Sequence, residues 1–151
     1  MPEITLRKAK PEDLAFVSQC AEAAYSLYVD RIGKKPAPMV ADFAAAERAN
    51  QLEVMQAGDV PVGFCVSFPR EDHLFVENIA LHPDHQGKGL GGAAFSLLEQ
   101  RARSSGQAAI ELYTNEKMTE NLAFYPRLGF RETARVCEHG FNRVYFRKEL
   151  T

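Results

Sequence analysis

A glycine-rich segment between an apolar run and a helix-like run constrains this chain more than any other feature. The segment Gln86–Gly92 reads Gln-Gly-Lys-Gly-Leu-Gly-Gly, and it follows the apolar run Leu74–Leu81. The run Ala93–Arg101 after it has the composition of a helix. A strand, a glycine turn and a helix in this order present several backbone N–H groups at the helix N-terminus, where phosphates bind. The segment therefore predicts a site for a phosphorylated ligand.

Hydrophobic periodicity and turn residues predict the remaining elements. Strands are expected at 4–9, 52–56, 62–68, 74–81, 108–113, 130–137 and 141–148, and helices at 11–28, 40–49, 89–103 and 119–128. The order β-α-α-β-β-β-α-β-α-β-β predicts an α/β (or α+β) fold. We expect one domain over residues 1–151, with a mixed, mostly antiparallel central sheet flanked by helices.

Composition narrows the classes of partner. The net charge of −2 argues against nucleic acid, because binding to a phosphate backbone usually needs a basic face. No run is long enough to span a bilayer and no signal peptide precedes the first strand, so we expect no membrane and a cytoplasmic protein. Cys20, Cys65 and Cys137 are predicted to be small, reduced core side chains. The pair His82 and His85 lies across a proline in a loop, so no metal site is expected.

Two common phosphate loops fit the glycine segment poorly. A nucleotide P-loop needs Ser or Thr after Gly-Lys, but Lys88 is followed by Gly89. The dinucleotide fingerprint matches formally at Gly87-x-Gly89-x-x-Gly92, with Glu111 about twenty residues on. However, five residues separate the glycines from the strand end, the apolar pattern continues beyond Glu111, and two strands precede the motif.

A third possibility is a coenzyme A pyrophosphate loop. Gln86-Gly87-Lys88-Gly89-Leu90-Gly91 resembles the Gln/Arg-x-x-Gly-x-Gly/Ala signature of the GNAT superfamily of N-acetyltransferases. Glu77–Pro83 before it is similar to the family's central strand and its exit. The block Asn121–Phe130 resembles the family's helix that ends in Tyr-x-x-x-Gly-Phe, and the order of elements over the whole chain agrees. The chain is therefore identified as similar to this family, and the acyl-CoA N-acyltransferase fold is expected.

The resemblance implies that acetyl-CoA is the co-substrate and assigns residues to it. The pyrophosphate is expected on the glycine loop and the pantetheine arm on the central strand, with further contacts from the next strand and helix. The implied cofactor-binding residues are Ile79, Ala80, Leu81, Gln86, Gly87, Lys88, Gly89, Leu90, Gly91, Gly92, Asn115, Asn121 and Phe124. Family members often carry Asn where this chain has Met118, so Asn115 and Asn121 are alternatives for the usual pantetheine contact.

Two side chains are expected to perform the chemistry. Tyr125 is the candidate general acid, because a phenol with a pKa of about 10 is protonated at pH 7 and can protonate the leaving thiolate. Glu77 is the candidate base, because an acid inside an apolar strand faces a cleft or is paired, and burial would raise its pKa. A water chain is the alternative to Glu77.

The acceptor is expected to be a small-molecule amine or a peptide amine. The segment after the first helix often borders the acceptor site in this family, which points to Tyr28, Arg31 and Met39. The identity of the amine stays open. The alternative function is a non-catalytic acetyl-CoA-binding sensor or assembly module. The hairpin Phe141–Lys148 suggests a homodimer, since such hairpins often pair between subunits in this family.

Overall fold

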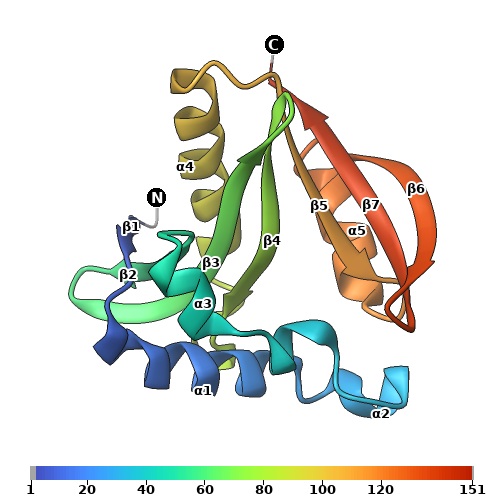
Figure 1. Cartoon of the computed structure of the whole chain (residues 1–151), viewed down its shortest axis with the longest axis horizontal. Helices are drawn as coiled ribbons and strands as arrows, with labels where there is room; N and C mark the ends of the chain where they lie inside the picture. The colour runs from blue at the N-terminus through green and yellow to red at the C-terminus, as the bar shows by residue number, and fades with distance from the viewer. Residues whose placement is uncertain (1–2, 151) are drawn as a thin grey trace. The chain divides into compact units, whose positions relative to one another are not determined.

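The computed structural model describes residues 3–150 and contains one seven-stranded sheet in the order β1-β2-β3-β4-β5-β7-β6 (Figure 1). The strands are β1 (Thr5–Lys8), β2 (Leu52–Ala57), β3 (Val60–Arg70), β4 (His73–Leu81), β5 (Ala109–Asn115), β6 (Arg131–Glu138) and β7 (Phe141–Glu149). The α-helices are α1 (Leu14–Tyr25), α2 (Tyr28–Ile32), α3 (Phe43–Arg48), α4 (Leu90–Ser104) and α5 (Thr119–Arg127). Only β4 and β5 pair in parallel among the strand pairs described below, so the expected fold class is confirmed.

The first helical region differs from the prediction in detail. The expected helix from residue 11 begins as a 3-10 turn, Pro11–Asp13, and is interrupted after Tyr25, so that α1 and α2 are separate helices. Gly33 ends α2 in the left-handed region, at a φ of 87°. The expected helix at 40–49 begins only at Phe43, because Pro36 and Pro38 favour a 3-10 turn at Ala37–Val40. Asp42 caps α3 by accepting the N–H of Ala45 at 3.0 Å.

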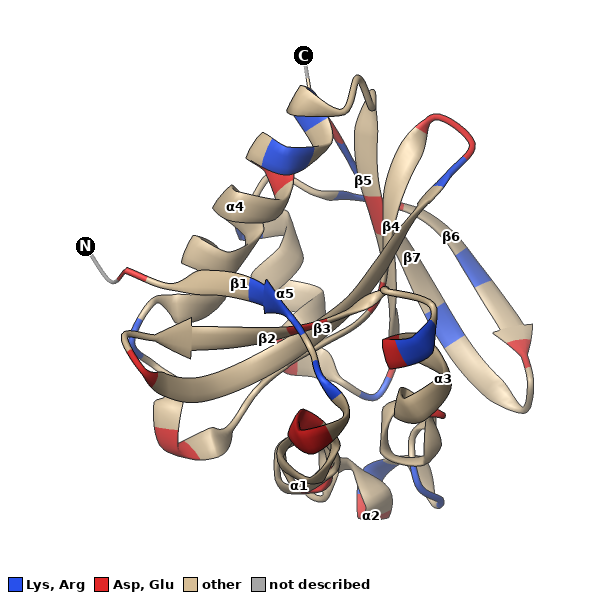
Figure 2. Ribbon diagram, turned by 60° about the vertical axis from the view of Figure 1, so that its left-hand side comes forward, with Lys and Arg blue, Asp and Glu red and all other residues tan. Residues whose placement is uncertain are grey.

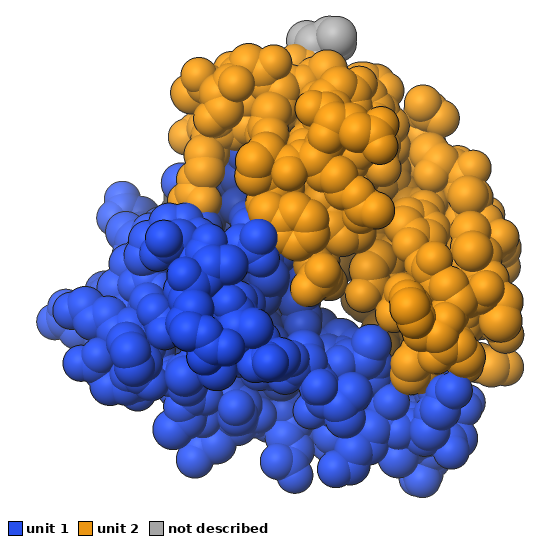
Figure 3. All heavy atoms as spheres, in the orientation of Figure 1, with its two compact units in different colours: residues 1–67, 78–98 blue, residues 68–77, 99–151 orange. Residues whose placement is uncertain are grey.

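The chain divides into two compact units, which Figure 3 colours separately. Unit 1 comprises Met1–Ser67 and Asn78–Leu98, and unit 2 comprises Phe68–Glu77 and Glu99–Thr151. In unit 1, β2 pairs antiparallel with β1 and with β3. Met55 and Val62 from these strands pack with Leu90 and Ala94 of α4 in a buried cluster. This cluster fixes the start of α4, and with it the glycine loop, against the sheet.

In unit 2, β5 pairs in parallel with β4, from His73–Ala109 to Val76–Leu112, and antiparallel with β7. Figure 1 shows β5, β7 and β6 side by side, with α5 behind them. Tyr125 of α5 packs against Phe146 of β7, with 5.6 Å between ring centroids. The strand face that carries Phe146 is called the α5 face; its other members on β5 and β7 are Ile110, Leu112, Thr114, Val144 and Lys148.

The opposite strand face of unit 2 carries alternating aromatic and charged side chains. Because successive side chains of a strand point to opposite faces, the register assigns one set of residues to this face. We call it the Tyr113 face; its members include His73, Phe75, Glu77, Glu111, Tyr113, Asn115, Phe141, Arg143, Tyr145, Arg147, Val136 and Glu138. Figure 2 shows basic and acidic residues close together along the β6–β7 hairpin.

Candidate active site

The glycine loop in unit 1 has a backbone conformation that is compatible with an anion site. Gly87 and Gly89 adopt φ angles of 79° and 78°, a region that costs about 1–2 kcal/mol for a residue with a Cβ. The carbonyl of Gly89 accepts the N–H of Ala93 at 3.2 Å, so α4 begins directly at the loop. Gln86, Lys88 and both glycines are exposed. The loop therefore presents accessible backbone at the N-terminus of a 15-residue helix.

The end of β4 leads into this loop and is fixed by side chains of unit 1. The hydroxyl of Tyr25 donates to the carbonyl of Ile79 at 2.8 Å, and the side-chain amide of Gln86 donates to the carbonyl of Leu81 at 3.0 Å. The N–H of His82 instead donates to Val62 of β3. Since backbone groups alternate along a strand, the N–H groups of Ile79 and Leu81 point away from β3, on the same edge as their carbonyls. That edge is the one expected to receive the pantetheine arm.

The close approach of β3 and β4 explains one further glycine. A Cβ on Gly63 would collide with the carbonyl oxygen of Ala80, and it would lie 3.2 Å from the Cα of Leu81. Gly63 therefore allows the end of β4 to lie against β3. Tyr25 was expected only in the segment that borders the acceptor, and Gly63 was not predicted as a site residue. Their contacts with β4 were missed because each acts on β4 from a distant part of the sequence.

The segment expected to border the acceptor contains partly exposed side chains. Tyr28 is buried, and the guanidinium of Arg31, which is exposed, lies 5.1 Å from the centre of the Tyr28 ring. Met39 lies half-buried in the 3-10 turn before α3. Leu27 and Val40 are exposed large hydrophobic side chains of the same segment. The burial of Tyr28 gives it a packing role within unit 1, alongside the ring of Tyr25 at 6.3 Å.

In unit 2, Tyr125 is buried and is surrounded by aromatic rings. Its ring centroid lies 5.4 Å from that of Phe124, 5.8 Å from that of Phe130 and 5.6 Å from that of Phe146. Gly129 follows α5 at a φ of 96°, so the chain turns sharply and brings Phe130 back onto Tyr125. The Tyr-x-x-x-Gly-Phe pattern therefore has a structural reason, which is that it fixes the orientation of the tyrosine.

The two candidate asparagines are held differently. The side-chain oxygen of Asn115 accepts the N–H of Lys117 at 2.9 Å, and so stabilises the turn before α5. The side-chain amide of Asn121 donates to the hydroxyl of Thr114 at 3.1 Å and approaches the sulfur of Met118 at 3.7 Å. Met118 thus occupies a buried position between the helix and β5. The roles of both asparagines in binding pantetheine stay predictions.

Glu77 does not have the surroundings that the sequence suggested. Its side chain was expected to be buried within an apolar strand, but it is exposed, so that expectation is wrong. The neighbours Val76 and Asn78 are buried on the other face of the strand. On the Tyr113 face, the charge of Glu77 acts on Tyr113, whose pKa is raised mainly by burial and additionally by Glu77 and Glu138. Glu77 is therefore accessible on a face rich in polar groups.

A cluster on the Tyr113 face was missed by the sequence reasoning. The guanidinium of Arg143 lies 4.2 Å from the centre of the Tyr113 ring and donates to Glu138 at 3.1 Å. The hydroxyl of Tyr145 also donates to Glu138. Together these hydrogen bonds lower the pKa of Glu138, while burial raises the pKa of Tyr145 to about 12. The sequence signal that could have revealed this cluster is the alternation along β7, which places Phe141, Arg143 and Tyr145 on one face.

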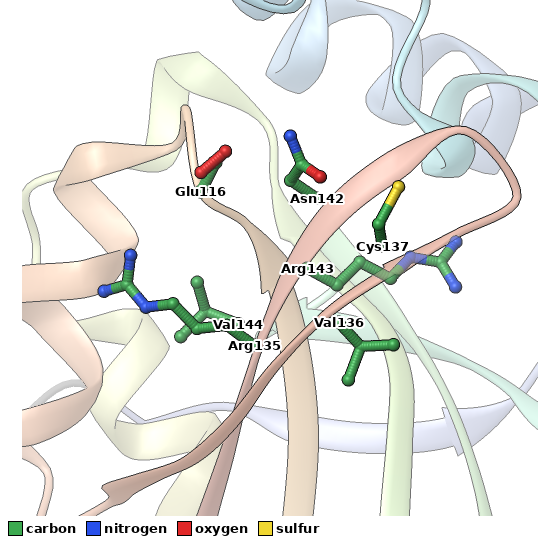
Figure 4. Close-up of a pocket in the computed structure, with 7 residues that line it drawn as sticks. All are labelled: Glu116, Arg135, Val136, Cys137, Asn142, Arg143 and Val144. Atoms are coloured by element: carbon green, nitrogen blue, oxygen red, sulfur yellow. The ribbon is translucent and has the colours of Figure 1, made fainter.

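Two pockets of unit 2 adjoin this part of the sheet. One, of about 230 Å³, is lined by residues of the β6–β7 hairpin and by Glu116. Figure 4 shows Arg135 and Val144 on one side of the hairpin and Arg143 and Val136 on the other. The second pocket, of about 180 Å³, contains His73 and Arg147. Arg147 forms ion pairs with Asp72 at 2.9 Å and with Glu111 at 2.6 Å. The carboxylate of Glu111 is therefore paired with an arginine of the neighbouring strand β7.

The described residues contain neither a cluster of metal ligands nor a helix able to span a membrane. Within residues 3–150, no group of three or more His, Cys, Asp or Glu side chains is arranged to hold a metal ion. Among the described helices, none has the length and apolar character needed to span a bilayer. Cys20 and Cys65 are buried as expected, and burial raises the pKa of Cys20 to about 12. Cys137 is exposed, so its prediction as a core residue is wrong.

The comparisons with known proteins agree with these features. Residues 18–130 match the Acetyltransferase (GNAT) family. The chain belongs to this family. The GNAT assignment covers the glycine loop, the end of β4 and the Tyr125 helix. The predicted cofactor residues 79–92 lie in unit 1, whereas Glu77, Asn115, Asn121, Phe124 and Tyr125 lie in unit 2.

Relatives within the GNAT family differ in what they act on. The chain is 34% identical over 74 residues to the L-amino acid N-acyltransferase MnaT of Escherichia coli K12, a match that covers 49% of this chain and 43% of that protein. The match thus spans less than half of the relative's length. The ribosomal-protein-S18-alanine N-acetyltransferase of Escherichia coli has the same fold, with a TM-score of 0.77, 18% identity and coverage of 99% and 95%. The PaiA N-acetyltransferase of Thermoplasma acidophilum, solved with coenzyme A, has a TM-score of 0.77, 16% identity and coverage of 97% and 99%.

Proposed function

We propose that this GNAT protein is an acetyl-CoA-dependent N-acetyltransferase that moves the acetyl group to a primary amine by direct attack in a ternary complex. The observation that carries the proposal is the glycine loop at the start of α4, with Gly87 and Gly89 in the left-handed region. Family membership supports it, as does the coenzyme A bound to the similarly folded protein of Thermoplasma acidophilum.

The geometry of unit 1 supports a scheme for donor binding. The backbone N–H groups of Gly87–Gly91 would bind the pyrophosphate, with the positive end of the α4 dipole behind them. The exposed ammonium of Lys88 would add charge at the rim. The N–H groups of Ile79 and Leu81 would pair with the amide oxygens of the pantetheine arm, and one N–H of this edge would stabilise the thioester oxyanion.

The reaction exchanges a C–S bond for a C–N bond. The neutral amine attacks the thioester carbon, and the tetrahedral intermediate collapses by breaking the bond to sulfur. The nitrogen gives up one proton, which Glu77 or a water chain accepts, and the leaving thiolate takes the proton of the Tyr125 hydroxyl. Tyr125 regains its proton from solvent. No covalent bond to the protein forms in this scheme.

The acceptor is a small-molecule or peptide amine. The name of one relative specifies L-amino acids, and the name of one structural neighbour specifies a ribosomal protein. Small-molecule amines and protein amines both therefore occur among the acceptors named for similar proteins. The unpaired state of all three cysteines fits a reducing compartment, and we propose a cytoplasmic location.

A thiol-release assay tests the proposal. The protein is incubated with acetyl-CoA and a panel of L-amino acids, simple primary amines and short peptides, and free CoA is measured with a thiol reagent. We expect release that depends on the amine and an N-acetyl product in equal amount. Binding of CoA with no release for any amine would instead support the non-catalytic sensor or assembly module.

A further inference from the structure

Arg143 is an unusual residue on the Tyr113 face, because it is more than nine-tenths buried and yet only partly hydrogen-bonded. Its exposed fraction is 9%. Its guanidinium stacks over Tyr113 at 4.2 Å, and Phe141 lies 5.9 Å away. One nitrogen, Nη1, donates to Glu138 at 3.1 Å. Since a guanidinium has five N–H donors, most of its donor capacity is not used by this ion pair.

The remaining donors of Arg143 reach solvent. Among the residues that the structure describes, the only buried side-chain nitrogen or oxygen without a partner is Oδ1 of Asn78. Any unpaired nitrogen of Arg143 must therefore be accessible. Glu138 accepts the hydrogen bond from Nη1 of Arg143, which leaves the N–H groups of Nε and Nη2. These two nitrogens can donate two parallel hydrogen bonds to a carboxylate. The aromatic ring below fixes the plane of the guanidinium.

Glu77 lies on the same face at a suitable distance. Neighbouring strands are about 4.8 Å apart, so β4 and β7, which flank β5, are separated by roughly 10 Å. Arg143 leans over Tyr113 toward β4, so the gap between its guanidinium and Glu77 is shorter. A ligand between these two groups would make one polar contact of about 3 Å to Arg143 and another to Glu77. A few ångströms then remain for the ligand itself. An amine and a carboxylate on one carbon fit that gap.

The helices of unit 2 pack on the opposite face of the strands. In the described chain, α5 packs on the α5 face through Tyr125, and the end of α4 is tied to the same face by the Lys148–Glu99 ion pair at 3.0 Å. Tyr113 and Tyr145, 5.6 Å apart, are only partly buried. Unit 2 thus supplies an aromatic floor with an acid at one end and an arginine at the other.

We propose that Arg143 binds the carboxylate of the acceptor, and that the acceptor is a free α-amino acid whose amine lies toward Glu77. The inference rests on the proposed N-acetyltransferase function and narrows its substrate class. A peptide N-terminus has no carboxylate beside its amine, so it lacks the group that Arg143 recognises. Arg143 is then a specificity-determining residue, and Glu138 orients it through the Nη1 hydrogen bond.

The experiment compares each standard L-amino acid with its carboxamide, using the wild-type protein and the variants Arg143→Gln and Arg143→Lys. Turnover is measured by thiol release, and binding to the CoA-loaded protein by calorimetry. We expect the wild type to prefer the free acid of its best substrate at least tenfold in kcat/KM. Arg143→Gln should lose about 10- to 100-fold with the acid and less than about threefold with the amide, as expected for a charge-assisted contact. The Arg143→Lys variant should retain an intermediate preference.

Arg135→Gln is the matched control, because Arg135 lies on the opposite side of the same hairpin and pairs with the exposed Glu132. It should leave the preference unchanged, and CoA binding should be intact in all variants. Equal turnover of acids and amides by the wild type would overturn the inference and leave the proposed function standing. Arg143-dependent binding of an amino acid without turnover would support the inference and refute the function. Absence of both binding and turnover for every amino acid would refute the inference.

Discussion

Tyr125 is held by three aromatic rings, so its orientation depends on packing that a phenylalanine can reproduce. The rings are those of Phe124, Phe130 and Phe146, all within 6 Å between centroids. A Tyr125→Phe substitution removes only the hydroxyl and leaves this packing in place. The residue is therefore a suitable position at which to separate chemistry from binding.

We expect Tyr125→Phe to lower kcat by about 100-fold or more while KM for acetyl-CoA changes less than about threefold, because a general acid acts on the leaving thiolate and not on the bound ground state. Steady-state kinetics at saturating amine measures both constants. Phe124→Leu serves as a comparison for altered packing. An unchanged kcat in Tyr125→Phe would remove the hydroxyl from the mechanism.

Glu77 is accessible, so its role must be judged from kinetics and not from burial. Loss of the carboxylate in Glu77→Gln should lower kcat/KM by about 100-fold near neutral pH, because the attacking amine loses its proton acceptor. The deficit should shrink as the pH approaches the pKa of the amine, where the amine is already neutral. A profile from pH 6 to pH 9 gives the comparison, with the exposed Glu132→Gln as control. Wild-type activity of Glu77→Gln over this range would favour a water chain.

At the scale of elements, the glycine loop depends on two left-handed backbone positions. We predict that Gly89→Ala raises KM for acetyl-CoA at least tenfold, because a φ of 78° is unfavourable for alanine and the N–H groups would turn away from the pyrophosphate. The control is Gly58→Ala in the β2–β3 turn, where φ is 64° and a Cβ would meet nothing within 4 Å.

Both glycine variants should lose similar stability, about 1 kcal/mol, so their melting temperatures should fall together. Only Gly89→Ala should lose the thermal stabilisation that saturating CoA confers on the wild type. Equal CoA stabilisation of both variants would show that the loop conformation is unimportant for binding.

The entry to α1 provides a pH-dependent element. Asp13 accepts two hydrogen bonds from Arg7, at 2.8 and 2.9 Å, and one from the backbone N–H of Lys10 at 2.7 Å. The hydrogen bonds from Arg7 are the main reason that the pKa of Asp13 is lowered to about 2. A lowered pKa stabilises the fold above the unfolded pKa near 3.8, and the contribution disappears as the pH falls toward 2.

We therefore expect Asp13→Asn to lower the free energy of unfolding by about 1 kcal/mol at pH 7, a value that allows for solvent screening of this partly exposed pair. The difference from the wild type should shrink steadily below pH 4. Urea denaturation at several pH values measures it, with Asp59→Asn in an exposed turn as control. A difference that is constant from pH 7 to pH 3 would contradict the assignment to the Asp13 carboxylate.

At the scale of the whole molecule, the sequence predicted elements better than contacts. Local signals placed every strand, because alternation and the turns at Gly58 and Gly140 are encoded by neighbouring residues. The division between α1 and α2 was missed, since the break after Tyr25 has no proline or glycine. The motif around Tyr125 and the glycine loop were both found from the sequence, because the residues of each motif are consecutive.

The contacts that the sequence could not supply depend on strand register. Tyr25 reaches Ile79 from 54 residues away, and Arg143 lies over Tyr113 only because β5 and β7 pair with Asn115 opposite Arg143. Burial of Glu77 was wrongly expected because an apolar strand suggests cover on both faces. Burial instead alternates along this end of β4: Val76 and Asn78 are buried, whereas Glu77 is exposed on the Tyr113 face.

The central claim is direct transfer of the acetyl group from acetyl-CoA to an amine, and initial-rate kinetics test it most directly. Both substrates are varied together, with the best amine of the panel, and the product is identified by mass spectrometry. The account predicts reciprocal plots that intersect, one N-acetylated amine for each thiol released, and no acetylated protein, the exposed Cys137 included. Parallel plots with an acetylated protein, or thiol release that does not depend on the amine, would contradict it.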